Sequence, residues 1–301
     1  GLLVFSRCLT GLGAAVGMVM NFTLIHDVYR HEQARKILAY ILMLSAIMPG
    51  IAATVGGYLS DTFHWHAVLY FLFVYCLMVF LICRRLPETG LSYDPHACKI
   101  SHIFRGYRQQ FSNRQLMLGA MLMGGNTALI YVFSAISPFV MIVDQGLSSE
   151  QYGTLMLIPS IGLLLGSFLS ASLVKMFKTG QVIFLGLGCI FLSTCLMFIV
   201  FRWFGPAACA IFPLMFFIYM GIALCYSNAS SLTLTTTSNT SNGAAVISFM
   251  NTTITMLAVF GIQVFRLSNV IALPILLVSI ALLMIIVYLM LLKSIKSLSV
   301  S

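Results

Sequence analysis

Arg7 is the one charged residue that lies inside a long apolar run of this sequence, residues 2–25. A charge within an apolar helix is costly unless it is paired or faces water, so such a residue is a candidate for proton or ion chemistry. Gly11 and Gly13 follow on the same run and favour this interpretation, because small residues allow close helix contacts. The alternative is that Arg7, close to the start of the chain, extends its guanidinium toward polar surroundings.

Residues that usually carry out catalysis do not gather within the apolar runs. All seven Asp and Glu lie in or near the connections, and no run combines a serine with a base or two histidines with a carboxylate. Two polar segments could offer metal ligands, one with His96, Cys98 and His102 and one with His64 and His66, but neither contains an evident fourth ligand. We therefore expect neither an enzyme nor a metal site.

The composition indicates a protein whose surroundings are mostly lipid. Of its 301 residues, 60% are hydrophobic and 8% are charged, whereas a soluble domain carries about 25% charged residues. The formal net charge of +9 could indicate a nucleic-acid-binding protein, but the basic residues lie between the apolar runs rather than together on one face. We therefore expect a membrane protein without a nucleic-acid partner.

Uncharged runs long enough to cross a membrane recur along the whole chain. A spanning helix needs about 20 mostly apolar residues, so the sequence predicts an all-α membrane protein of about nine transmembrane helices. The polar segment from Ser227 to Gly243 is expected to connect the seventh and eighth of them. The predicted spans are residues 2–25, 37–59, 67–83, 115–143, 151–174, 181–201, 207–228, 243–265 and 270–292.

Two of these runs carry short motifs of small residues, arginine and proline. Residues 7–15 read R-C-L-T-G-L-G-A-A, which resembles the fourth-helix motif of major-facilitator proton antiporters. The second run contains Pro49, Gly56 and Gly57, and it resembles the fifth-helix antiporter motif. Glycine lets neighbouring backbones approach, and proline kinks a helix, so general membrane packing is an equally open interpretation of this region.

Further segments resemble the same family in the same order. Trp65 and His66 follow in a short loop, residues 86–89 read L-P-E-T, and residues 221–232 and 242–245 resemble the tenth helix and the start of the eleventh. Together these features resemble the Bcr/CflA drug-resistance family, the drug/proton antiporters of the major facilitator superfamily. The chain departs from the family pattern at residues 52 and 53, two alanines in place of Gly-Pro, and at His66 in place of Arg.

The resemblance implies a major-facilitator fold of which this chain holds helices four to twelve. Residues 1–83 would form a partial N-terminal bundle of helices four to six. Residues 84–114 would form a cytoplasmic linker, and residues 115–301 the C-terminal six-helix bundle. We therefore expect the chain to be N-terminally truncated, with the carboxylate that couples protons belonging to the missing first helix.

The resemblance also implies a function. Members of the Bcr/CflA family export small organic molecules such as drugs or metabolites, by alternating access, in the bacterial inner membrane. The proton gradient is the energy source and no cofactor is needed, so the partners are a small-molecule substrate, protons and the bilayer, and we expect a monomer. Arg7 would help to relay protons beside the cavity. The alternative is a truncated, non-transporting remnant or membrane interaction protein.

Residues with amide or aromatic side chains occur in the spans that correspond to the cavity-lining helices four, seven and ten. Such side chains suit amphipathic or cationic organic substrates through dispersion and cation–π attraction. For any single one of them, packing or a hydrogen bond between helices is the favoured interpretation, and the substrate contact stays open. The candidates are Asn21, Asn126, Tyr131, Tyr219, Tyr226 and Asn228.

The basic residues predict the orientation of the chain in the membrane. If the first span runs inward, thirteen Lys and Arg fall on the cytoplasmic side, while Arg202 and Arg266 fall on the outer side. Cytoplasmic loops carry the excess of basic residues, so the C-terminus is expected in the cytoplasm. A reporter that is active only in the periplasm should therefore be silent when fused after Ser301, and reporter activity there would contradict the predicted topology.

Overall fold

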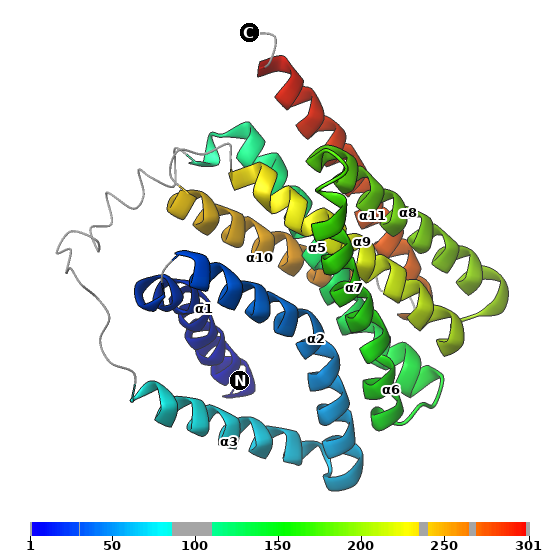
Figure 1. Cartoon of the computed structure of the whole chain (residues 1–301). Coiled ribbons are helices and arrows are strands. Elements are labelled where there is room, and N and C mark those ends of the chain that lie inside the picture. The colour runs from blue at the N-terminus through cyan, green and yellow to red at the C-terminus, as the bar shows by residue number, and fades with distance from the viewer. Residues whose placement is uncertain (1, 30, 86–109, 235–239, 265–268, 299–301) are drawn as a thin grey trace. The chain divides into compact units, whose positions relative to one another are not determined.

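The structure of the chain, a computed structural model, describes residues 2–29, 31–85, 110–234, 240–264 and 269–298. Within these residues the regular elements are helices and no strand occurs (Figure 1). The all-α class predicted from the sequence is therefore confirmed. The helices are α1 (Leu2–Val28), α2 (His31–Phe63), α3 (Trp65–Cys83), α5 (Arg114–Pro138), the π-helix η1 (Phe139–Asp144), α6 (Ser149–Leu155), α7 (Leu157–Leu173), α8 (Thr179–Phe204), α9 (Ala208–Leu234), α10 (Thr240–Val264) and α11 (Asn269–Leu298).

The predicted spans coincide with these helices. Eight helical segments of the described part are long and apolar enough to cross a membrane, and the remaining predicted span, residues 2–25, coincides with α1. In α3 no side chain is buried, and all of its apolar residues from Leu69 onward are exposed. A helix that is apolar on every face fits lipid rather than water as its surroundings.

Prolines divide two of the predicted spans into shorter segments. The span over residues 115–143 is α5 followed by the π-helix η1, and the change comes directly after Pro138. The span over residues 151–174 is α6 followed by α7, with a break at Met156, three residues before Pro159. Proline has no N–H and so cannot donate to the carbonyl four residues earlier, which interrupts the regular α-helical pattern.

The polar segment expected to connect two spans, residues 227–243, does contain the point where α9 gives way to α10, but both helices extend into it. Helix α9 continues to Leu234 and α10 begins at Thr240. The hydroxyls of Ser227, Ser231 and Thr233 donate to the carbonyl oxygens four residues earlier, at 2.9, 3.2 and 2.6 Å. Because these side chains bond within their own helix, a run rich in Ser and Thr can remain helical inside a membrane.

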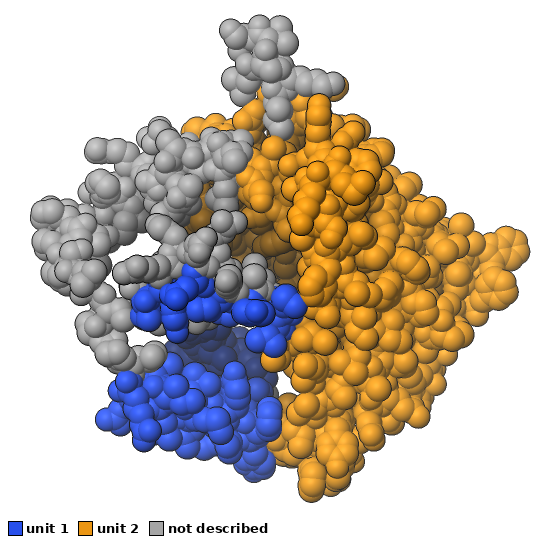
Figure 2. All heavy atoms as spheres, in the orientation of Figure 1, with its two compact units in different colours: residues 1–45, 69–96 blue, residues 46–68, 97–301 orange. Residues whose placement is uncertain are grey.

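The chain divides into two compact units (Figure 2). The first comprises Gly1–Ser45 and Leu69–His96, and the second Ala46–Val68 and Ala97–Ser301. The second half of α2 thus groups with the helices that follow residue 110. Most of the predicted linker, residues 86–109, lies outside the described residues, as do the possible ligands His96, Cys98 and His102, so the domain limits predicted from the sequence stay predictions.

The core of the second unit forms around α5. This helix packs against α9, α10 and α11, while α9 also packs against α7 and α8. Its buried face carries Leu122, Leu129 and Phe133, which are fully enclosed. The Phe133 ring meets Phe212 of α9 edge to face, with ring centroids 6.3 Å apart. These contacts hold α5 and α9 at the centre of the unit.

Glycines allow the closest helix contacts in this unit. A Cβ atom added at Gly162 of α7 would collide with the backbone of Phe216 in α9, whereas one added at Gly188 of α8 would meet no atom within 4 Å. The first glycine is therefore required by packing and the second is not.

We expect Gly162→Val to lower the free energy of unfolding by about 1–3 kcal/mol, the usual cost of overpacking. Gly188→Val, the same change in α8, the next helix along the chain, should have little effect. The measurement is unfolding of each purified variant in detergent micelles, followed by circular dichroism. Equal stability of the two variants would contradict the packing described for α7 and α9.

Candidate functional site

The arginine and glycines of the first motif lie on exposed parts of α1. Arg7 is exposed, and a Cβ atom added at Gly11 or Gly13 would meet no atom within 4 Å. The close helix contact expected at these glycines is therefore not formed within the described residues of the first unit. The side chain of Asn21, also in α1, lies outside the described part.

The second motif forms a close contact between helices. A Cβ atom added at Gly57 of α2 would collide with the carbonyl oxygen of Ser149, and one added at Gly153 of α6 would collide with the carbonyl oxygen of Ala53. One added at Gly50 would lie 2.6 Å from the hydroxyl oxygen of Ser160 in α7. We call this contact, residues 50–61 of α2 against residues 149–160, the glycine seam.

Other residues of the second motif take no part in this seam. Gly56 has no atom within 4 Å of an added Cβ, and the side chain of Pro49 is exposed. Pro49 lies inside α2 all the same, where it removes one backbone hydrogen bond. Of the three motif residues predicted in this helix, the structure thus assigns the helix contact to Gly57.

Hydrogen bonds of Thr54 and Asp61 cross the glycine seam. The hydroxyl of Thr54 lies 2.9 Å from the carbonyl oxygens of both Gly153 and Gly50, so it joins α6 to its own helix. Near the end of α2, the Asp61 carboxylate accepts a hydrogen bond from the backbone N–H of Glu150 at 2.9 Å. A carboxylate at the first turn of a helix also interacts favourably with the helix dipole.

Sequence reasoning did not single out Thr54 or Asp61. Asp61 looks like an ordinary helix-end charge, and its partner is 89 residues away in the chain. A usable signal was present in the partner helix, where Ser149 and Gly153 are small residues four positions apart. Such spacing is typical of close helix contacts in membranes, but it does not say which helix is approached.

Asn126, one of the cavity candidates, is fully buried between α5 and α9. Its Nδ2 donates to the carbonyl oxygen of Leu122 at 2.9 Å and to the sulfur of Cys225 at 3.3 Å. Its Oδ1 has no hydrogen-bond partner among the described residues. The side chain therefore connects two helices of the core and is shielded from any open cavity.

Two candidates on α9 also have partners within the protein. Tyr219 is buried, and its ring meets Phe133 of α5 with centroids 6.5 Å apart. Asn228 is buried on the side of α9 that faces α7, where its Nδ2 donates to the Ser170 hydroxyl at 2.8 Å. The Ser170 and Ser227 hydroxyls lie 3.0 Å apart and complete this polar contact.

The remaining candidates are more accessible. Tyr131 of α5 is 56% exposed, and Tyr226 of α9 is half-buried. The structure brings Asn126 and Tyr219 to the same interface between α5 and α9. Asn228 lies instead at the contact with α7, and Tyr131 lies on another face of α5 than Asn126, because five residues correspond to about 140° of helix rotation.

The hydrogen bond across the seam can be tested by substitution. Thr54→Val keeps the shape of the side chain and removes the bond to Gly153, so we expect the free energy of unfolding to fall by about 0.5–1.5 kcal/mol. The control is Thr252→Val in α10, whose hydroxyl bonds only the Ser248 carbonyl of its own helix. Unfolding by titration with a denaturing detergent measures both. A loss of equal size in the control would show that Thr54 contributes nothing across the seam.

Comparison with known proteins agrees with the fold. Multidrug resistance protein D of Escherichia coli (strain K12) is 29% identical over 204 residues, which cover 67% of this chain and 50% of that protein. An uncharacterized transporter of Rickettsia felis is 27% identical over 201 residues, 66% of this chain and 49% of the relative. A bicyclomycin resistance protein homolog of Haemophilus influenzae is 22% identical over 188 residues, which cover 62% of this chain and 47% of that protein.

The chain thus spans about half the length of the curated relatives it matches. The sequence profile of the Major Facilitator Superfamily matches residues 1–262, most of the chain. This match agrees with several membrane-spanning helices and with a fold that contains no strand in its described part. The chain therefore belongs to the Major Facilitator Superfamily of membrane transporters.

Proposed function

We propose that this chain is part of a proton-coupled exporter of small organic molecules, of the Bcr/CflA group, in a bacterial inner membrane. Family membership supports transport, and relatives named for multidrug and bicyclomycin resistance support export of drugs. The observation that carries the mechanism is the glycine seam between α2 and α6 with α7. The proposal concerns the whole transporter, of which this chain provides helices four to twelve.

The seam is suited to opening and closing. In alternating access, helices from the two halves of a transporter meet on one side of the membrane and separate on the other. Residues 50–61 of α2 extend over about 16 Å of helix, roughly half of a bilayer core of about 30 Å. With the expected topology this is the outer half. We therefore propose that the seam closes the outer side of the transport pathway.

The chemistry of the seam explains why it could separate without a large barrier. Its close contacts involve the backbone and small side chains of Gly57, Gly153 and Ser149, and residues 51–61 of α2 are all exposed or half-buried. Close backbone packing and the hydrogen bonds of Thr54 and Asp61 hold the two sides of the seam together. Water that enters an opened pathway can replace hydrogen bonds of this kind, so their net cost is about 0.5–1.5 kcal/mol each.

The substrate is proposed to be amphipathic or cationic. Tyr131 and Tyr226 are the candidates with accessible aromatic rings, which attract organic cations through their faces. Asn126, Tyr219 and Asn228 have protein partners in this structure, so they would contribute by holding α5, α7 and α9 together. Asn21 stays a proposed contact from the first unit.

Arg7 is proposed to take part in proton coupling. Its guanidinium stays charged at all physiological pH values, so it would not release a proton itself. It would instead favour the ionised form of a nearby carboxylate, which binds and releases the proton. None of the Asp or Glu residues lies deep in a predicted span, so that carboxylate is proposed to belong to another helix of the transporter.

The test is efflux by the complete gene, expressed from its own start codon in a bacterium that lacks its major drug pumps. We expect efflux of cationic dyes or drugs that stops when an uncoupler collapses the proton gradient. Arg7→Gln should lower the efflux rate at least about tenfold, equivalent to about 1.4 kcal/mol. Arg85→Gln, a change at an exposed residue in the turn after α3, is the control and should leave the rate unchanged.

The alternative function, a remnant or interaction protein without transport, predicts a different result. In that case cells that express the complete gene export no substrate faster than cells that lack it, although the protein is present in the membrane at normal levels. Efflux that persists with an uncoupler would support transport but contradict proton coupling. Expression of the 301-residue chain alone, in the same cells, separates what these helices can do from what the complete gene product does.

A further inference from the structure

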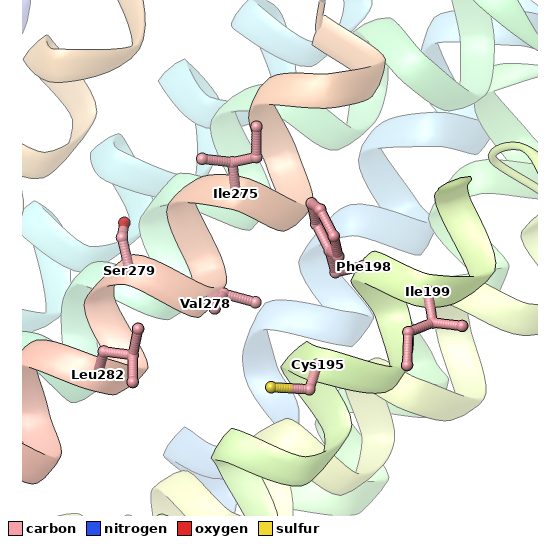
Figure 3. A pocket seen from close by; sticks show the side chains of 7 residues that line it. All are labelled: Cys195, Phe198, Ile199, Ile275, Val278, Ser279 and Leu282. Atoms are coloured by element: carbon pink, nitrogen blue, oxygen red, sulfur yellow. The ribbon is translucent and has the colours of Figure 1, made fainter. Parts of the chain in front are cut away.

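An apolar groove lies on the second unit between α8 and α11, which pack against each other. It has a volume of about 440 Å³. Figure 3 shows its side chains, with Phe198 beside Ile275 at one end and Cys195 toward Leu282 at the other. The lining consists of Cys195, Phe198, Ile199, Ile275, Val278, Ser279 and Leu282.

The lining suits hydrocarbon rather than water. The hydroxyl of Ser279 donates to the carbonyl oxygen of Leu276 at 2.9 Å, so its hydrogen is already used within α11. Nearly all the other lining atoms are apolar. Both helices are apolar enough to cross a membrane, which places the groove at the depth of the lipid tails. A hydrocarbon chain in the groove would restore the dispersion contacts that the two helices do not make with each other.

A cation lies one turn beyond this groove on the same face of α8. Cys195, Phe198, Ile199 and Arg202 follow the spacing i, i+3, i+4 and i+7, which puts them on one side of a helix. Arg202 is exposed, lies in the last turn of α8 and forms no ion pair with the described residues. Its Cα lies roughly 6 Å further along the axis than that of Phe198, near the depth expected for headgroups.

The neighbouring residue also indicates the membrane interface. Trp203 is 79% exposed, and tryptophan is enriched where lipid headgroups meet the hydrocarbon. Helix α8 ends shortly afterwards, at Phe204, before Gly205 with its positive φ of 76°. The groove therefore runs from the hydrocarbon toward an interface at which a guanidinium is available.

We propose that the groove between α8 and α11 holds one acyl chain of an anionic phospholipid whose phosphate binds Arg202. The apolar walls account for the chain and the guanidinium for the headgroup. A zwitterionic lipid carries its own ammonium group, which partly neutralises its phosphate, so a lipid with net negative charge is favoured. One basic residue near a membrane surface corresponds to a preference of about fivefold.

Trp203 provides a direct readout of the lipid beside it. The chain has two tryptophans, so Trp65→Phe leaves Trp203 as the sole fluorophore. This variant is reconstituted into phosphatidylcholine vesicles that contain brominated phosphatidylglycerol or, in parallel, brominated phosphatidylcholine. Bromine quenches tryptophan at short range. We expect half-maximal quenching at an about fivefold lower fraction of brominated phosphatidylglycerol than of brominated phosphatidylcholine.

Variants in the same background separate the charge from the groove. Arg202→Gln should abolish the preference, and Arg202→Lys should retain most of it. Ser279→Phe, which fills the groove while Arg202 is kept, should also abolish it. Arg85→Gln, at an exposed residue in the turn after α3, should have no effect. Helix content by circular dichroism shows that each variant is folded.

Three results would overturn the proposal. The first is equal quenching by the two lipids in the Trp65→Phe protein, which would mean that Arg202 only stabilises the C-terminus of α8. The second is a preference that survives in Arg202→Gln. The third is a lipid preference that is lost when inorganic phosphate is added but is kept in Ser279→Phe. That result would show that Arg202 binds a free anion without an acyl chain in the groove.

Discussion

The structure depends on the need to satisfy the polar backbone groups, and most polar side chains, without water. In hydrocarbon an unsatisfied N–H or C=O group costs several kcal/mol, so hydrogen bonds form within each helix or with its neighbour. The Ser and Thr hydroxyls of α9 bond to the preceding turn, and the helix therefore continues to Leu234. Where Pro138 removes a donor, the chain changes to a π-helix and keeps its backbone bonded.

The same surroundings determine how the helices associate. Lipid tails are as apolar as leucine, so burial of apolar surface drives helices together only weakly, and close packing takes its place. Gly162 brings α7 against the backbone of α9, and Gly57 with Gly153 brings α2 against α6. The first contact belongs to a core that contains fully buried side chains such as Phe133 and Phe212. The glycine seam has no comparable set of large buried side chains, and this difference fits a fixed core beside a contact that can separate.

Side chains that the helices leave without protein neighbours form the lipid-facing surface. Most of that surface is apolar and interacts with any lipid tail. The α8–α11 groove differs because it is concave and ends near Arg202, so that apolar shape and charge lie on one helix face. A lipid there would contribute both packing and an ionic contact, which links the stability of this pair of helices to the composition of the membrane.

The sequence by itself determined the class of the protein, its spans and its family motifs. Spans follow from length and composition, because the thickness of the hydrocarbon core demands about 20 apolar residues for each helix. Arg7 and the glycines around it, together with Pro49, Gly56 and Gly57, could be located because their motifs are local in the chain. The candidate site was predictable to the level of residue type and helix, and no further.

Tertiary structure decided which of these residues meet. Asn126, Tyr219 and Asn228 look alike from the sequence, yet Asn228 bonds α7 while Asn126 and Tyr219 lie at the interface of α5 and α9. Asp61 contacts a backbone group 89 residues away, and Gly57, unlike Gly56 beside it, approaches α6. The physical reason is that successive residues of a helix point about 100° apart, and the direction that meets a partner is set by helices distant in the chain.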